Sequence, residues 1–387
     1  MKGKAVNTGS YFVQGDVAIA EGAIAAGCRY FAGYPITPVS ELSETMAERL
    51  PEVGGICMQM EDELASIHST SGASVGGLKA MTASSGPGIS LKLEGLGWAI
   101  KNEIPIVVVD VQRAGPSNGV ATNVGQADYY TVKYGSAGGN NEIIALSPKS
   151  VQEAFDLTIE CFNLAEIFRC PVFLLTDETV GHMRERMVIP EESAIKRVER
   201  FKPTVPPEEF KMYPLETPDV IRYPFPNIGE GYGICVSPYT HNSYGYDVTS
   251  PEGQRKMADR LVMKIRAHKD ELVRVEKVDL DDADIAVVCY GGVARPALSA
   301  VQQARAEGIK AGMLRPIIVW PFPDGEVEAV ADKVHTILVP EINVDGQMCR
   351  EVERAAHGKA RVVHIPHGGV EPHKPIEILE QLRRYGR

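Results

Sequence analysis

The sequence predicts an α/β protein with largely parallel sheets, and three observations support this fold class. Short apolar runs alternate with segments of helix length through the first part of the chain. The same alternation returns near the C-terminal end. Several polar or Gly-rich turns stand between an apolar run and the next helical segment. In parallel sheets such turns lie at the carboxyl ends of the strands, where ligands bind. The length of 387 residues favours two or three domains.

The first part of the chain contains one helix that is clear from its spacing. Residues 16–26 carry apolar side chains at helical intervals and end at Gly27, a common helix stop. Further helices are expected from near Val39 and over residues 64–77. The expected strands of this part lie at residues 29–32, 56–60, 79–83, 106–112 and 171–176.

From about residue 189 to residue 277 the alternation gives way to Pro-rich and charged sequence. Tyr and Phe are too frequent there for a disordered tail, so we expect an ordered connecting excursion. A second α/β unit follows, with strands expected at residues 285–290, 311–314, 336–340 and 361–364. The predicted division is therefore residues 1–190, the excursion 191–277, and residues 278–387.

Composition excludes several function classes. A formal net charge of −11 argues against a nucleic-acid-binding surface, which needs clustered Lys and Arg to neutralise phosphates. No stretch approaches the roughly 18 apolar residues of a spanning helix, and no signal peptide is recognisable. We therefore expect a cytoplasmic protein that binds neither nucleic acid nor membrane.

The 7 cysteines are scattered, and no two stand at the spacing of a C-x-x-C pair. Iron–sulfur clusters and structural zinc usually need such clustered thiolates, so we expect neither on this chain and assign it no metal. The sequence also lacks an H-E-x-x-H motif. The sequence therefore lacks the usual motifs of zinc proteases and thioredoxin-like proteins.

Two polar turns follow expected strands early in the chain. In the first, Thr37 with Pro38 can cap a helix, and the same hydroxyl and free amides can also hold a carboxylate. In the second, residues 61–63 are three consecutive acids at the head of a helix rich in Ala, Ser and Gly. Complementing the helix dipole is one interpretation. The other interpretation is a carboxylate held in a buried site, because a helix with so many small side chains is typical of close packing rather than of an exposed surface.

Two later turns also stand at strand ends. The Ser-Ser-Gly-Pro-Gly turn at residues 84–88 lets backbone approach a ligand, but it matches neither the Walker nor the dinucleotide pattern. Arg113 lies where a buried strand leaves the sheet. It is either one half of a structural ion pair or a bidentate clamp for a carboxylate.

Taken together, four segments resemble the alpha subunits of 2-oxoacid:ferredoxin oxidoreductases. They are GYPITPVSE (33–41), EDELASIHSTSGAS (61–74), TASSGPG (82–88) and QRAGPSNGVATNVGQAD (112–128). The resemblance covers nearly the whole chain. It implies a thiamine diphosphate-binding fold of the pyrimidine type, followed by a transketolase C-terminal-like α/β domain.

The resemblance also implies roles for particular residues. Glu63 matches the glutamate that hydrogen-bonds N1′ of the cofactor's aminopyrimidine. Thr37 and Arg113 match the residues that hold the carboxylate and ketone oxygen of the substrate. The remaining cofactor contacts implied are Tyr34, Pro35, Ile36, Ser85 and Gly86.

The GDG-type motif that binds magnesium and diphosphate in this fold is absent from the sequence. The resemblance therefore implies a beta subunit with a diphosphate-binding domain, and it places Mg²⁺ and [4Fe-4S] clusters on partner subunits. It further implies a separate gamma subunit, allows a small delta subunit, and names ferredoxin as electron acceptor.

The reaction implied is the reversible, coenzyme A-dependent oxidative decarboxylation of a 2-oxoacid. QRAGPSNG with GQADYY and ALSPKSVQE is most similar to subunits acting on 2-oxoglutarate, which yields succinyl-CoA. Branched-chain 2-oxoacids and pyruvate are the alternative substrates. A noncatalytic docking subunit is the alternative function.

Overall fold

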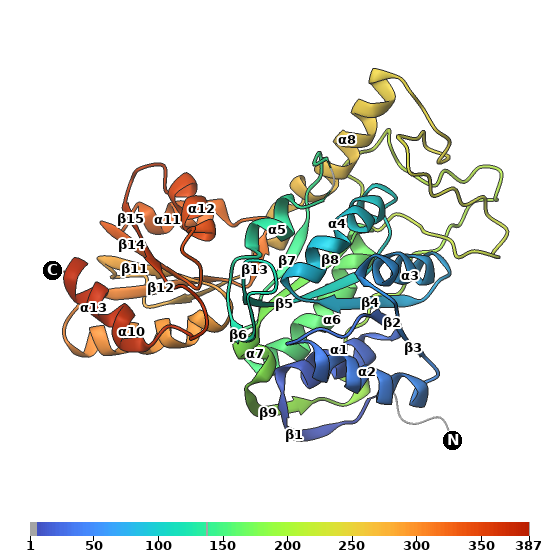
Figure 1. The fold of residues 1–387 in the computed structure, drawn as a ribbon. Helices are drawn as coiled ribbons and strands as arrows, with labels where there is room; N and C mark the ends of the chain where they lie inside the picture. The colour runs from blue at the N-terminus through green and yellow to red at the C-terminus, as the bar shows by residue number, and fades with distance from the viewer. Residues whose placement is uncertain (1–5, 137, 387) are drawn as a thin grey trace.

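The computed structural model describes residues 6–136 and 138–386, which build two parallel sheets and a small antiparallel pair (Figure 1). The larger sheet has the strand order β13-β7-β8-β5-β4-β2-β3, with β6 paired antiparallel to β5. Its strands are β2 (Cys28–Gly33), β3 (Ile56–Gln59), β4 (Lys79–Ser84), β5 (Val107–Ala114), β6 (Val120–Val124), β7 (Ile144–Leu146), β8 (Val172–Asp177) and β13 (Ile318–Trp320).

Helices cover both faces of this sheet, as a parallel sheet requires. Val107 and Val109 of β5 belong to the apolar cluster of α1 (Gly15–Ala26), α2 (Ser40–Glu52) and α6 (Val151–Phe168). Val108, between them, belongs instead to the cluster of α3 (Glu63–Val75) and α4 (Gly86–Lys101). This alternation explains why β5 reads as a continuous apolar run.

A short antiparallel pair closes one end of this unit. β1 (Gly9–Gln14) pairs with β9 (Arg184–Ile189), which follows the short helix α7 (Glu178–His182). α1 begins directly after β1 and packs against α7. The N-terminus of α1 and the C-terminus of α7 therefore lie together.

The connecting excursion is ordered but mostly irregular between a 3₁₀ turn at Glu192–Ala194 and α8 (Pro251–Arg266). Its Phe210, Tyr213 and Phe225 are buried in the core. α8 extends away from the sheets in Figure 1, and α9 (Lys269–Leu272) and β10 (Val275–Val278) follow it. The sequence analysis did not predict α8. It assigned residues 191–277 to one connecting excursion because much of that segment is Pro-rich, although a helix starts at Pro251.

The second sheet has the order β10-β12-β11-β14-β15, parallel except for β10. Helices again cover both faces, and α10 packs against α13 while α11 packs against α12. Its further elements are β11 (Ile285–Val288), a 3₁₀ turn (Gly291–Val293), α10 (Ala294–Ala306), β12 (Ala311–Pro316), α11 (Asp324–Ala331), β14 (Thr336–Glu341), α12 (Gln347–Ala356), β15 (Arg361–Pro366) and α13 (Pro375–Tyr385).

β13 belongs to the C-terminal part of the chain but pairs antiparallel with β7 of the first sheet. The Trp320 ring lies 4.7 Å from that of Tyr129 in α5 (Tyr129–Tyr134), centroid to centroid, and its Nε1 donates to the Tyr129 carbonyl. The two units are thus joined by a shared sheet. Within the described residues, no helix has the length and apolar character needed to cross a membrane.

Candidate active site

The carboxyl ends of four neighbouring strands meet at one edge of the larger sheet. β2 lies between β3 and β4, β5 lies next to β4, and all four run parallel. The loop after β2, the start of α3 after β3, the start of α4 after β4 and the end of β5 therefore share this edge. This is where open α/β sheets bind their ligands.

Arg113 and Thr37 are brought into direct contact at this edge. The Arg113 side chain is 5% exposed, and its Nη1 donates to the Thr37 carbonyl oxygen at 2.7 Å. Nη2 donates weakly to Asn118 Oδ1 at 3.4 Å, and Nε has no partner. No ion pair of Arg113 occurs among residues 6–136 and 138–386, so a structural ion pair does not explain it. The guanidinium keeps donors available for an anion.

The prediction that Thr37 caps a helix with Pro38 at its first position is wrong. α2 begins at Ser40, and its N-cap is Val39. The amide of Val39 donates to the Ile36 carbonyl at 2.9 Å, so residues 36–39 form a turn before the helix starts. Thr37 instead presents its carbonyl oxygen to Arg113.

The three consecutive acids have three different environments. Glu61 is exposed. Asp62 is the N-cap of α3 and accepts from the Ala65 amide at 2.7 Å. Glu63, the first residue of α3, is 6% exposed. Helix capping therefore explains Asp62, while Glu63 is the carboxylate that the fold holds in a buried position.

Gly88 explains how α4 approaches Glu63 so closely. A Cβ at Gly88 would lie 2.6 Å from Glu63 Oε1 and 2.0 Å from Ser84 Oγ, so only glycine fits. One turn further along α4, the Lys92 ammonium is buried and donates to Thr82 Oγ1 at 3.1 Å. Burial lowers the pKa of Lys92 to about 8, while the charge of Glu63 opposes that shift. Glu63 thus lies in a small-residue environment with a cation nearby.

Several polar groups at the same edge are buried without partners. Ser84 of β4 pairs in register with Asp110 of β5, and neither side chain makes a hydrogen bond. The Ser85 hydroxyl is likewise buried and unpaired. Burial raises the pKa of Asp110 well above its ordinary value, and the nearby charge of Asp128 adds to this. Buried unsatisfied groups are rare in native proteins, and here they border the Glu63 environment.

Asp128 links this group to Arg113. Burial raises the pKa of Asp128 to about 6, and the positive charge of Arg113 lowers it. A Cβ at Gly86 would lie 3.9 Å from Asp128 Oδ2, so the turn before α4 reaches the same place. Sequence reasoning missed both Asp110 and Asp128. Asp110 had a visible signal, because a carboxylate inside the apolar run VVVDV cannot be explained as an exposed residue.

Tyr34 and Pro35 are placed differently from the other predicted residues. Both are exposed and line an open hollow of about 420 Å³ together with Met58 and Gln59 of β3. Ile36 is partly buried against the cluster of α1, α2 and α6. In the part of the chain that the structure describes, no hydrogen bond joins these side chains to Glu63.

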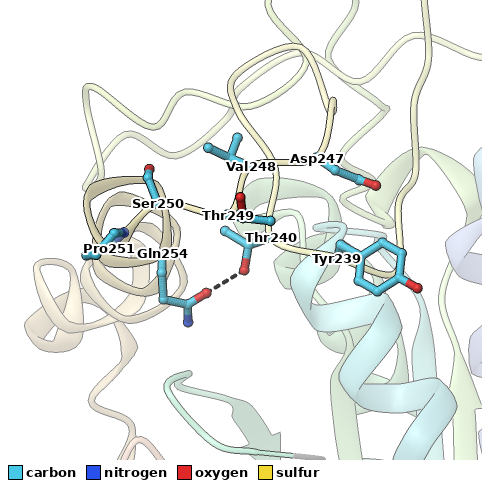
Figure 2. A pocket seen from close by; sticks show the side chains of 8 residues that line it. All are labelled: Tyr239, Thr240, Asp247, Val248, Thr249, Ser250, Pro251 and Gln254. Atoms are coloured by element: carbon cyan, nitrogen blue, oxygen red, sulfur yellow. Dashed lines mark hydrogen bonds between the residues drawn. The ribbon is translucent and has the colours of Figure 1, made fainter.

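A larger hollow of about 620 Å³ lies on the connecting excursion and α8 (Figure 2). Thr240 donates to Gln254 across it, as Figure 2 shows. Asp247 is the one carboxylate that lines it, and the Ser237 hydroxyl donates to that carboxylate. Apart from Asp247 and the Tyr239 phenol, no ionisable side chain of the described residues lines this hollow, so the sheet edge is the better candidate site.

Comparison with known proteins decides which family these features represent. Residues 21–258 match the family model described as pyruvate flavodoxin/ferredoxin oxidoreductase, thiamine diphosphate-binding, and residues 283–373 match pyruvate:ferredoxin oxidoreductase core domain II. The chain is 48% identical to "2-oxoglutarate synthase subunit KorA" of Methanothermobacter marburgensis over 97% of its own length and 99% of that protein. The chain belongs to the alpha-subunit family of the 2-oxoacid:ferredoxin oxidoreductases. The predicted family is confirmed.

Other members of the family are also similar along most of the chain. The Methanocaldococcus jannaschii protein of the same name is 47% identical over 95% of this chain and 97% of its own. "Ketoisovalerate oxidoreductase subunit VorB" of Methanothermobacter thermautotrophicus is 37% identical over 96% of each. Each of these relatives is named as one subunit of an enzyme.

Solved structures confirm the fold. A 2-oxoglutarate:ferredoxin oxidoreductase from Magnetococcus marinus, described with 2-oxoglutarate, coenzyme A and succinyl-CoA bound, matches with a TM-score of 0.91 at 29% identity. The match covers 98% of this chain but spans only 65% of the solved one. A split-gene transketolase shares the fold at a TM-score of 0.52 and 12% identity. The thiamine diphosphate-binding fold with a transketolase-like second unit is therefore confirmed.

The residues at the sheet edge fit part of a thiamine diphosphate site. The Glu63 carboxylate is buried, and within the described ranges no hydrogen bond satisfies it. Ser84 and Ser85 add buried hydroxyls without partners, and Gly86 leaves the turn open for a ligand to approach. These groups suit a polar aromatic ring, and none forms a cluster suited to Mg²⁺ and diphosphate.

Proposed function

We propose that this chain is the catalytic alpha subunit of an enzyme that converts 2-oxoglutarate and coenzyme A to succinyl-CoA and carbon dioxide, with ferredoxin as electron acceptor. The observation that carries the proposal is the buried Arg113 guanidinium, unpaired with any described carboxylate, at the sheet edge that holds the buried Glu63. Relatives at 46–48% identity are named 2-oxoglutarate synthase, which favours this substrate over the branched-chain acids.

In this proposal Arg113 binds the carboxylate of the 2-oxoacid through two parallel N–H donors. The Thr37 carbonyl orients the guanidinium, and the Thr37 hydroxyl contacts the ketone oxygen. Burial of Arg113 excludes water and strengthens its attraction for the substrate anion. The distal carboxylate of 2-oxoglutarate then meets groups of a partner subunit.

Glu63 acts on the cofactor rather than on the substrate. Thiamine diphosphate, when bound, supplies the carbon nucleophile and the electron sink for decarboxylation. Glu63 holds and shares a proton at N1′ of the aminopyrimidine, and it can do so because Asp62 caps α3 and Gly88 fixes the carboxylate from the opposite helix. Ser85 and Gly86 contact the ring from the α4 side, and residues 34–36 from the β2 side.

The rest of the enzyme is proposed to lie on other chains. The seven cysteines are free, and none belongs to a group of three or more ligating side chains among the described residues, which supports placing [4Fe-4S] clusters on partners. A beta subunit would supply Mg²⁺ and diphosphate ligands, with gamma and delta subunits completing the assembly. Within this chain we propose residues 1–190 as the pyrimidine-binding domain, 191–277 as the connection and 278–387 as the transketolase-like domain.

The substrate is tested in the assembled complex by comparing kcat/KM for 2-oxoglutarate, pyruvate and 2-oxoisovalerate. We expect 2-oxoglutarate to be preferred by at least about tenfold, since a site built for a second carboxylate discriminates strongly against acids that lack it. A clear preference for pyruvate or 2-oxoisovalerate would overturn the substrate assignment while leaving the family unchanged.

A further inference from the structure

A second cluster of ligating side chains lies where α1, α2 and α7 meet, apart from the residues proposed for catalysis. Asp16 stands in the first turn of α1, Glu41 in the first turn of α2, and His182 at the end of α7. One ligand atom of each lies within 4.8 Å of those of the other two. These residues come from distant parts of the sequence, so the fold alone brings them together.

Asp16 is the most unusual member of this cluster. Its side chain is fully buried, and neither carboxylate oxygen has a hydrogen-bond partner. Gly181 packs against it so closely that a Cβ there would lie 2.9 Å from Asp16 Oδ1. A buried carboxylate is unfavourable unless a proton or cation neutralises it. Asp16 therefore points into a place that calls for a positive charge.

His182 is oriented as metal-binding histidines are. Its Nδ1 lies 3.2 Å from Glu178 Oε1, which leaves Nε2 free to face Glu41 Oε2 at 3.5 Å. Nε2 is buried and makes no hydrogen bond. A carboxylate on one ring nitrogen fixes the tautomer and directs the other nitrogen to the metal in many sites. In this cluster Glu178 is the carboxylate that fixes the tautomer of His182.

Glu41 completes the set and leaves a way in for an ion. Its Oε1 accepts from Gln14 Nε2 at 3.5 Å, while its other oxygen faces His182. The side chains of Glu41 and His182 are 36% and 27% exposed. Ligand atoms about 2.1 Å from a tetrahedral ion lie about 3.4 Å apart, so closing around one from separations of up to 4.8 Å requires side-chain shifts of up to about 1.4 Å.

We propose that Asp16, Glu41 and His182 bind one divalent transition-metal ion, Zn²⁺ or Mn²⁺, with Glu178 orienting the imidazole. One imidazole nitrogen with carboxylate oxygens suits these ions better than the all-oxygen preference of Ca²⁺ or Mg²⁺. The sequence expectation of no metal rested on cysteine spacing and did not consider this N/O set. The ion ties α1 and α7 to α2, the helix that follows the Thr37 turn.

The test uses the purified full-length chain, stripped with a chelator and titrated with Zn²⁺ by calorimetry and with Mn²⁺ by electron paramagnetic resonance. We expect one equivalent per chain, with a Kd at or below about the micromolar range, and a rise in thermal midpoint on loading. Asp16→Asn and His182→Gln should each weaken binding at least about 100-fold, and Glu178→Gln about 10–100-fold.

His268→Gln is the matched control. His268 also pairs with a carboxylate, Glu271, at 2.7 Å, but it belongs to no three-residue group of ligating side chains among the described residues. This variant should bind as the wild type does. Asp16→Asn removes an unpaired buried charge, so the metal-free variant should fold at least as stably as the wild type and remains informative if His182→Gln unfolds.

Two results would overturn the proposal. One is the lack of saturable binding below about millimolar metal, which would mean that Asp16 is neutralised by a proton shared within the cluster. The other is binding of equal strength in the wild type and in Asp16→Asn, which would place the metal elsewhere. Neither result depends on turnover, so failure here is distinguishable from failure of the proposed reaction.

Discussion

Two buried clusters of charged and polar groups differ in how completely their members are paired. The first centres on Glu103, whose carboxylate accepts from Arg260 Nη2 at 2.8 Å and from Lys264 Nζ at 3.2 Å. Arg260 Nη1 also donates to the carbonyls of Pro218 and Val220. Burial raises the pKa of Glu103, but nearby cations, with Arg260 and Lys264 the largest, outweigh it and hold that pKa well below its usual range. This cluster fastens the excursion and α8 to the first sheet.

The second cluster lies at the carboxyl edge of the same sheet and is incompletely paired. Ser84, Ser85 and Asp110 are as deeply buried as Glu103, yet their side chains make no hydrogen bond. Full pairing identifies the first cluster as structural, since its partners are all on this chain. Unsatisfied groups favour the second as the place where a ligand is proposed to bind. The comparison shows that the presence of hydrogen-bond and ion-pair partners within the chain, and not the degree of burial, distinguishes a structural cluster from a candidate ligand site.

The largest expected effect is loss of rate at the unpaired cluster. Glu63→Gln keeps the size and hydrogen bonding of the side chain but cannot share a proton with N1′. In the assembled complex we expect kcat to fall by about 10²–10⁴, the usual contribution of general acid–base catalysis, with cofactor still bound. Steady-state kinetics with 2-oxoglutarate measure this.

Glu61→Gln is the control for that variant, because Glu61 is exposed and two residues away. Its activity should stay near that of the wild type. If Glu61→Gln abolishes activity while Glu63→Gln does not, the assignment along the helix is wrong by two residues. If neither matters, the assignment of α3 to cofactor activation is wrong.

Substitution in the paired Glu103 cluster should change the stability of the folded chain rather than the reaction rate. Glu103→Gln leaves both Arg260 and Lys264 buried without their shared carboxylate, so the free energy of unfolding should fall by about 3–5 kcal/mol. Urea unfolding of the isolated chain measures this. Glu216→Gln, which removes an exposed partner of Lys256, should change it by less than about 0.5 kcal/mol. Equal effects of the two would show that the Glu103 cluster contributes no special stability.

Arg113→Lys probes the clamp. An ammonium cannot reproduce two parallel N–H donors, so KM for 2-oxoglutarate should rise by about tenfold, roughly 1.4 kcal/mol of binding. The free energy of unfolding should change little, because no ion pair of Arg113 is found in the described residues. A lower stability with unchanged KM would make Arg113 a structural residue.

The smallest expected effect is a pH-dependent gain in the free energy of unfolding when Asp110 is replaced by Asn. The pKa of Asp110 is raised in the folded chain, so the unfolded chain ionises first as pH rises and folding loses stability above the unfolded pKa. Asp110→Asn should therefore stabilise the isolated chain at pH 7 by about 0.5–2 kcal/mol and much less near pH 4. Urea titrations at both pH values measure the difference. A variant that is destabilised at pH 7 would show that Asp110 has a partner in the folded chain.

Sequence reasoning predicted what local patterns determine. Strands β2, β4, β5 and β8 were predicted from apolar runs, and a buried acid was predicted from the small residues that follow residues 61–63. The resemblance to the family singled out Glu63 among the three acids. The Thr37 cap was wrong because a turn at residues 36–39 delays α2, which depends on local backbone rather than residue type. Asp128 was missed because its importance comes from lying close to Asp110 and Arg113 in space, whereas Asp110 had a signal in the sequence as a carboxylate within an apolar run.

Long-range pairing explains the other omissions. The three-residue β7 is too short to recognise, and it is a strand only because β13 and β8 pair with it. The same holds for the cluster of Asp16, Glu41 and His182, which no spacing in the sequence links. Contacts between distant segments thus limit what one sequence reveals.

The position of β13 has a consequence for synthesis of the chain. On the ribosome, β7 emerges early, but its outer edge stays without a partner until residue 320 has left the exit tunnel. Until then the backbone groups of β7 and the Tyr129 ring lack the strand and the indole that cover them. An unpaired edge of this kind is open to association with other nascent chains. The first half of this protein therefore completes its folding only after most of the second half has been translated.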